Sequence, residues 1–111
     1  MPVWNIGTVA DEPTVSLLQW RILETEDGSR HFVGADERDL TGRVSTAIVL
    51  LDRVTLRGET ESGRIYQLVG RSGRSSNADY VWHRWCKVNN VKAYADVTQQ
   101  FVAEVPNDKP A

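Results

Sequence analysis

The hydrophobic period of the chain changes once, near Gly70, and this change limits the possible folds more than any other feature of the sequence. Before Gly70, apolar residues alternate with polar ones or form short β-branched runs, a pattern typical of strands. After it, residues 80–90 place their apolar side chains on one arc of a helical projection: Val81, Trp82, Trp85, Cys86 and Val88. The sequence therefore predicts an α+β fold in which strands precede one amphipathic helix.

Five strands are expected, joined by short connections that favour an antiparallel meander. They cover residues 14–25, 30–35, 43–52, 55–61 and 64–70. Asp27 and Gly28 separate the first two and are typical of a tight hairpin turn. Residues 43–52 carry apolar side chains at both odd and even positions, which predicts a central strand covered on both faces. Residues 55–61 are polar, which predicts a strand at the edge of the sheet.

The amphipathic segment predicts a helix over residues 77–90 that packs its apolar stripe on one face of a twisted sheet. Ser76 and Asp79 resemble a capping box at its start, and Asn90 suits a left-handed residue at its end. Asp96 can cap a second, short helix near the C-terminus.

A chain of 111 residues fits one domain. We expect a mobile N-terminal arm over residues 1–12, a single domain over 13–105 and a disordered tail over 106–111. The longest apolar run, residues 47–51, is far shorter than the roughly 20 residues that span a bilayer, and the acidic N-terminus does not resemble a signal peptide. A cytoplasmic protein with no membrane segment is predicted.

The residues that enzymes use are sparse in this chain. One cysteine, Cys86, and two histidines form no cluster with the spacing of metal ligands, so neither a metal nor a disulfide is expected. His83 and Cys86 lie 60° apart on the helical projection with no third group to orient them, and Cys86 is better explained as a buried thiol. His31 is expected at the surface. No cofactor-binding loop is present, and an enzyme is not predicted.

Charge is distributed unevenly along the chain, whose net charge is −2. Residues 53–92 carry eight basic and three acidic side chains, whereas the segments before and after them are acidic. The loop at residues 70–76 combines glycines, arginines and serines just before a helix, which suits an anion such as a nucleic-acid phosphate. The candidate contacts are Arg53, Arg57, Arg64, Arg71, Ser72, Arg74 and Ser75. A soluble connector whose charges are neutralised within the domain explains the same composition.

Four tryptophans are many for a chain of this length. Trp20, Trp82 and Trp85 fall on predicted buried faces and are explained by packing of the core. Trp4, on the N-terminal arm, either docks onto the domain or anchors a partner protein, because exposed aromatic side chains are enriched at binding sites.

Two functions remain after these exclusions. The first is a small non-enzymatic module that binds another protein, a class that includes regulators and inhibitors encoded on bacterial mobile elements, such as anti-defence proteins, with Trp4 as its candidate contact. The alternative is an anion or nucleic-acid binder that uses the arginine-rich loop and the strand arginines. Neither function requires a cofactor, and the oligomeric state stays open.

Overall fold

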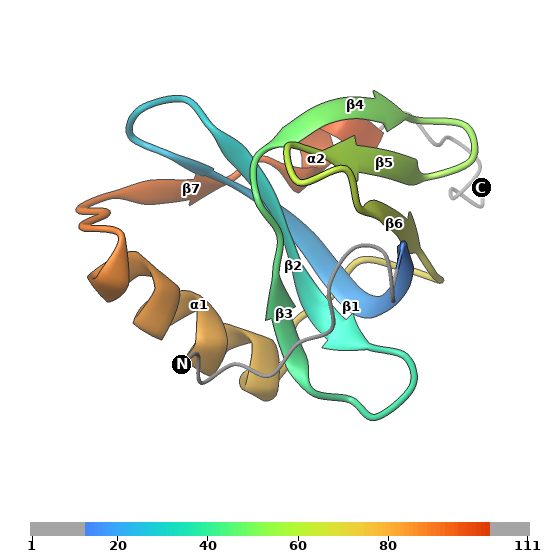
Figure 1. The fold of residues 1–111 in the computed structure, drawn as a ribbon, viewed down its shortest axis with the longest axis horizontal. Helices are drawn as coiled ribbons and strands as arrows, with labels where there is room; N and C mark the ends of the chain where they lie inside the picture. The colour runs from blue at the N-terminus through green and yellow to red at the C-terminus, as the bar shows by residue number, and fades with distance from the viewer. Residues whose placement is uncertain (1–12, 103–111) are drawn as a thin grey trace.

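The longest strand, β1 (Thr14–Thr25), organises the fold, which a computed structural model describes for residues 13–102 (Figure 1). Along one side β1 pairs antiparallel with β2 (Arg30–Asp36) through the Asp-Gly hairpin that the sequence predicts. Along its other side β1 has two partners in succession. Its first residues pair in parallel with β6 (Ile65–Leu68), and its last residues pair antiparallel with β7 (Tyr94–Asp96).

A bulge in β1 makes the exchange of partners possible. The register against β2 shifts between Leu18 and Arg21, and Gln19 adopts a left-handed conformation with φ 49°. Bulges bend a strand and increase its twist. The two halves of β1 therefore point in different directions, and the first pairs with β6 whereas the second pairs with β7.

The strand order in the sheet is β3-β2-β1-β6-β5-β4, with β7 beside the end of β1. β3 (Gly42–Val44) forms one edge, β4 (Ile48–Asp52) forms the other, and β5 (Arg57–Thr60) lies between β4 and β6. Two antiparallel meanders, β1-β2-β3 and β4-β5-β6, are thus joined through the parallel pair of β1 and β6.

The predicted α+β class is confirmed, with a largely antiparallel sheet and one main helix packed on it. The prediction of one central strand over residues 43–52 is wrong, because the segment breaks into two strands at opposite edges. The buried Ser45 marks the break: its Oγ accepts a hydrogen bond from the Phe32 N–H and donates one to the Thr46 carbonyl. The polar segment 55–61 is correspondingly not at an edge, since β5 has a neighbour on each side.

The helix α1 (Ser76–Val88) confirms the amphipathic prediction closely. Its N-cap is Ser75, whose side chain accepts a hydrogen bond from the Ala78 N–H, so the cap lies one residue earlier than predicted. Asn90 is left-handed, as expected, with φ 58°. The next N–H, from Val91, donates to the Cys86 carbonyl at 2.9 Å and completes a Schellman ending.

Two hydrophobic clusters cover the two faces of the β1-β2-β3 meander. The first packs Trp20 and Phe32 of the first meander with Tyr66 of the second, and the other lies beneath α1 and includes Trp82 and Cys86. Trp20 and Trp82 are buried and Trp85 is half-buried, so packing accounts for these three tryptophans, as predicted. Figure 1 shows α1 along one side of the first meander and α2 (Thr98–Val102) behind β4 and β5.

The C-terminal part of the described chain is only partly as expected. Asp96 accepts hydrogen bonds from the N–H and hydroxyl of Thr98, as a helix cap does, but the strand β7 that contains it was not predicted. The predicted arm and tail at residues 1–12 and 106–111 lie outside the described residues. Within residues 13–102, no helix is long and apolar enough to span a bilayer.

Candidate protein-binding surface

The arginine-rich loop that precedes α1 is tied to the helix and to β1. Arg74 Nη2 donates to Asp79 Oδ2 at 2.8 Å, and Arg21 Nη2 donates to the other oxygen of the same carboxylate. Ser75 is buried as the N-cap. Asp79 therefore holds two guanidinium groups at the first turn of α1, where the anion hypothesis requires an open positive site.

The other candidate anion contacts lie on separate features of the molecule. Arg53 lies beside Phe101, with its guanidinium carbon 5.4 Å from the ring centroid, and Arg57 donates to Gln67 Oε1 at 3.3 Å. Arg64 is buried at the start of β6, whereas Arg71 is exposed and Ser72 half-buried in the loop. The structure thus keeps Arg71 and Ser72 in one loop with Arg74 and Ser75, and places Arg53, Arg57 and Arg64 on other features. Trp4 lies outside the described residues.

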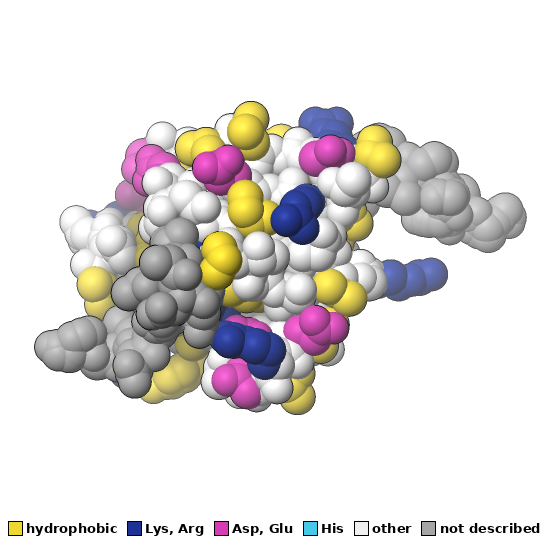
Figure 2. Space-filling model, turned by 45° about the vertical axis from the view of Figure 1, so that its right-hand side comes forward, with side chains coloured by type: hydrophobic (Ala, Val, Ile, Leu, Met, Phe, Trp, Pro, Cys, Tyr) yellow, Lys and Arg dark blue, Asp and Glu magenta, His cyan; other side chains and the backbone are white. Residues whose placement is uncertain are grey.

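The apolar strand β4 is the most exposed hydrophobic segment of the described chain. Ile48 and Leu51 pack against the core, whereas Val49 is 54 % exposed and Leu50 is 65 % exposed. Val54, in the turn that follows, is 90 % exposed. Figure 2 shows hydrophobic side chains along the upper edge of the molecule, the edge that β4 forms. Apolar side chains that cluster on a sheet edge, rather than lying singly, are typical of an interaction site.

The turn after β4 is held in place by one carboxylate. Asp52 Oδ1 accepts hydrogen bonds from the N–H groups of Val54 and Thr55, at 2.9 and 3.1 Å. These two bonds lower the pKa of Asp52, because they stabilise its ionised form. Val54 is therefore presented from an ordered turn.

Two arginines flank the exposed strand. Arg30 and Arg53 both lie over the ring of Phe101, with their guanidinium carbons 5.0 and 5.4 Å from its centroid. Together with β4 and Ile22, these three side chains line a cavity of about 240 Å³. We call this assembly the β4 surface: Val49, Leu50, Arg53, Val54, Arg30 and Phe101. Sequence reasoning missed it because an unbroken apolar run resembles a buried strand, and no local signal in the run distinguishes the two.

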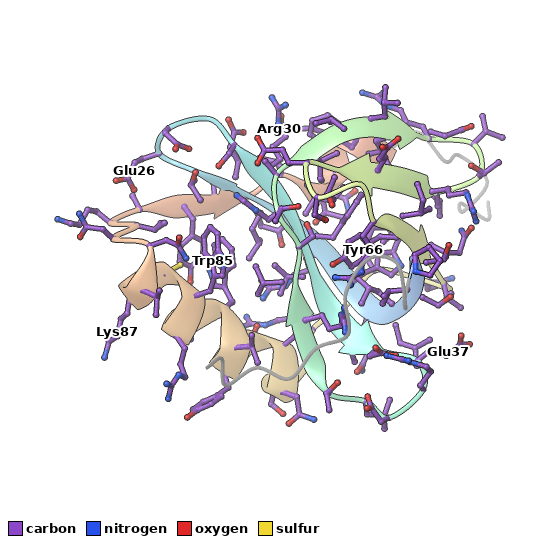
Figure 3. All side chains as sticks on the ribbon, viewed as in Figure 1. Glu26, Arg30, Glu37, Tyr66, Trp85 and Lys87 are labelled. Carbon is purple, nitrogen blue, oxygen red and sulfur yellow. The ribbon has the colours of Figure 1, made fainter. Side chains whose placement is uncertain are left out.

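A larger hollow, about 870 Å³, lies between α1, β3 and the start of β6. We call it the α1–β3 groove. Its apolar lining includes Val81, Trp85 and Val88, and its polar lining includes Arg43 and Arg64. Figure 3 shows Trp85 on the side of α1 that faces the sheet and Lys87 on the opposite side. Val88 belongs to the predicted stripe but is 76 % exposed, so the described core does not extend to the end of the helix.

A network of polar side chains lies at the hairpin between β1 and β2. Ser29 Oγ lies 2.9 Å from His31 Nε2 and 3.0 Å from Asp27 Oδ1, and His31 Nδ1 donates to the Ser45 carbonyl at 2.9 Å. His31 is buried, against expectation, because its ring packs 4.6 Å from that of Trp85. A serine beside a histidine can act as a nucleophile, but here the Ser29 hydroxyl donates a hydrogen bond to the Asp27 carboxylate within the hairpin turn. The arrangement stabilises the hairpin.

Two further titratable groups have shifted pKa values with structural causes. Burial alone raises the pKa of Asp36, but hydrogen bonds from the Arg38 side chain and backbone lower it more strongly, so Asp36 stays ionised. Burial raises the pKa of the Cys86 thiol. His83, which the helical projection places 60° from Cys86, forms its hydrogen bond with the Tyr94 hydroxyl, 3.3 Å from Nε2. Among the described residues no cluster of three or more acidic, histidine or cysteine side chains is placed to hold a metal ion.

The chain matches no family model, and neither a curated protein nor a solved structure is significantly similar to it. Its function is therefore inferred from its own residues.

Proposed function

We propose that this protein is a non-enzymatic module that binds another protein through the β4 surface, and that it acts as a small regulator or inhibitor. The observation that carries the proposal is the exposure of Val49 and Leu50 on an edge strand, beside two arginines that share one aromatic ring.

The exposed aliphatic side chains supply the driving force for binding. Complete burial of a valine or leucine side chain stabilises a complex by roughly 1.5–3 kcal/mol. Val49, Leu50 and Val54 together can therefore contribute several kcal/mol before the costs of association are subtracted. Because β4 pairs with β5 in the sheet and Asp52 holds the turn that follows, the backbone that carries these side chains is ordered before the partner arrives, which reduces the entropy lost on binding.

The arginines define the chemistry of the partner. Arg30 forms a long ion pair with Glu24, 3.8 Å between Nε and Oε1, and Arg53 is exposed at the end of β4. Guanidinium groups that rest on an aromatic ring are held in place by cation–π attraction and can still donate hydrogen bonds to a carboxylate. The surface thus fits a partner that presents apolar side chains next to aspartate or glutamate.

The test compares two substitutions of the same kind. Leu50→Lys places a charge in the β4 surface, whereas Leu40→Lys changes a leucine that is similarly exposed (53 %) in the turn before β3. A partner is captured from cell lysate with the wild-type chain, identified and purified, and its dissociation constant is measured for each variant by calorimetry. We expect Leu50→Lys to weaken binding by at least tenfold, which is about 1.4 kcal/mol, and Leu40→Lys to leave it unchanged.

Charge reversal provides a second arm of the same experiment. Arg53→Glu is expected to slow association and to weaken binding, because an acidic partner is then repelled. Equal affinities for the wild-type chain, Leu50→Lys and Arg53→Glu would show that the partner binds elsewhere, and the β4 surface would be abandoned as the site.

The anion-binding alternative stays a prediction, and the placement of its residues gives it less support. Arg74 is paired with Asp79, and Arg53, Arg57 and Arg64 lie on different features. The measurement is the binding of a labelled oligonucleotide as salt is varied, in the wild-type chain and in the double variant Arg71→Ala with Arg74→Ala. Salt-sensitive binding that the double variant loses is the result that would favour this function.

A further inference from the structure

The α1–β3 groove combines an apolar floor with charged side chains on its sheet side. Val81 and Trp85 project into it from α1, and Val88, at the end of the same stripe, is largely exposed. On the sheet side, Arg43 comes from β3 and Arg64 from the start of β6. A helix stripe of this kind is normally covered, because exposed apolar surface in a hollow gains free energy when another apolar group fills it.

The first described residue, Pro13, lies at the rim of this groove. The Pro13 carbonyl accepts a hydrogen bond from the Ile65 N–H at 2.8 Å, and Thr14 pairs with Ile65 in the parallel ladder. Arg64, which lines the groove, immediately precedes Ile65. Pro13, the first described residue, therefore lies within one residue of the groove lining.

The segment is long enough to follow the whole groove. An extended chain advances about 3.3 Å per residue, so Trp4 can lie up to roughly 30 Å from Pro13. The 13 residues of α1 span about 20 Å at 1.5 Å per residue. The maximum reach of the segment from Pro13 is therefore greater than the length of the helix that borders the groove.

The composition of the segment matches the lining of the groove. Trp4 and Ile6 are two positions apart, a spacing that places both side chains on one side of a chain whenever it is extended. The acidic pair Asp11 and Glu12 directly precedes Pro13, at the end of the segment that is nearest to the groove arginines. Arg43 also pairs with the buried Asp36, at 3.5 Å, and Asp39 lines the groove, so the charge match is strongest at Arg64.

We propose that residues 1–12 bind in the α1–β3 groove of their own chain, with Trp4 and Ile6 against Val81 and Trp85, and with Asp11 and Glu12 beside Arg64 and Arg43. In this arrangement Trp4 completes the apolar stripe of α1. The groove is then a site for an internal segment, and it is distinct from the β4 surface.

The experiment follows the fluorescence of Trp4 in the full chain. The spectrum of a Trp4→Phe variant is subtracted from that of the wild-type chain, and quenching of the difference signal by acrylamide is compared with that of free N-acetyltryptophanamide. Val81→Lys places a charge in the groove, and Val54→Lys makes the same change at a side chain outside it. Val88→Lys is a second groove variant whose exposed position spares the core. Each variant is paired with its own Trp4→Phe form, and circular dichroism verifies its fold.

We expect Trp4 to be quenched several-fold less efficiently than the free indole, and this protection to be lost in the groove variants and kept in Val54→Lys. Protection that varies with protein concentration would mean that the segment binds a second copy of the chain and would overturn the proposal. Quenching equal to that of the free indole, or protection that persists in both groove variants, would overturn it as well.

Discussion

The contact between β3 and α1 predicts a large effect for the smallest possible substitution, Gly42→Ala. A Cβ atom at Gly42 would lie 2.3 Å from the Asn77 carbonyl oxygen and 2.8 Å from the Ala78 Cα. Both atoms belong to the backbone of α1, so no side-chain rotation relieves the overlap. To reach ordinary contact distance, the start of the helix would have to move away from β3 by roughly 1 Å.

This movement would disturb the packing beneath the helix. Ala78 and Trp82 are buried in the cluster that joins α1 to the sheet. Ala78 lies at the point of contact with Gly42, and Trp82 lies one helical turn later. Overpacking in a core costs typically 1–3 kcal/mol, and a clash between two backbones belongs at the upper end, so we expect a loss of about 3 kcal/mol. For a domain of this size, each kcal/mol lowers the melting temperature by about 4–8 °C, which gives a fall of roughly 12–24 °C.

The assay is urea unfolding followed by far-ultraviolet circular dichroism and tryptophan fluorescence, with Gly73→Ala as the matched control. A Cβ at Gly73 would come no closer than 3.7 Å to Gln19, so we expect this variant to remain within about 0.5 kcal/mol of the wild type or to be slightly more stable. If Gly42→Ala were as stable as Gly73→Ala, the close contact between the backbones of α1 and β3 would be contradicted. The packing of the hydrophobic cluster beneath α1 would then also be wrong.

Two further predictions concern local hydrogen bonds. Ser75→Ala is expected to lower the free energy of unfolding by about 1 kcal/mol, as for other lost N-caps. Ser76→Ala is expected to lower it less, because Ser75 is the residue that accepts the hydrogen bond from the Ala78 N–H. Urea unfolding of both variants measures the two losses, and equal losses would contradict the assigned cap. Hydrogen bonds from the Thr25 hydroxyl first, and then from Ser29, lower the pKa of Asp27 from 3.8 to about 2. A lowered pKa stabilises the folded state above pH 3.8, and this contribution is lost as the pH falls toward 2. The carboxyl resonance in a nuclear magnetic resonance titration reports this pKa, which Thr25→Val is expected to raise; an unchanged value would show that Thr25 is not its main cause.

The elements that local chemistry determines were predictable from the sequence. The hairpin between β1 and β2 follows from Asp27-Gly28, and Gly28 indeed has a positive φ of 92°. The helix α1 follows from its 3.6-residue period, and Asn90 ends it in the expected conformation. Each of these features depends on residues within a few positions of one another, which is why the sequence alone indicates them.

The features that depend on distant partners were not predictable. The parallel pairing of β1 with β6 joins residues that are about fifty positions apart, and the bulge at Gln19 that permits it carries no glycine or proline. The β4 surface is of the same kind, because its exposure depends on where the sheet ends. The apolar run at residues 47–51 is compatible with a central strand or an edge strand, and only the tertiary pairing decides between them.

The position of β5 explains why β4 is left exposed. A polar strand can occupy the interior of this sheet because Gly58 is buried and lets the Phe32 ring approach its backbone; a Cβ there would lie 2.5 Å from Phe32 Cζ. The aromatic ring of β2 thus supplies the apolar cover that β5 lacks. Because the core is completed by this ring, Val49 and Leu50 are not needed to fill it. Two exposed aliphatic side chains at a sheet edge promote aggregation, and the partner proposed above would remove that liability by covering them.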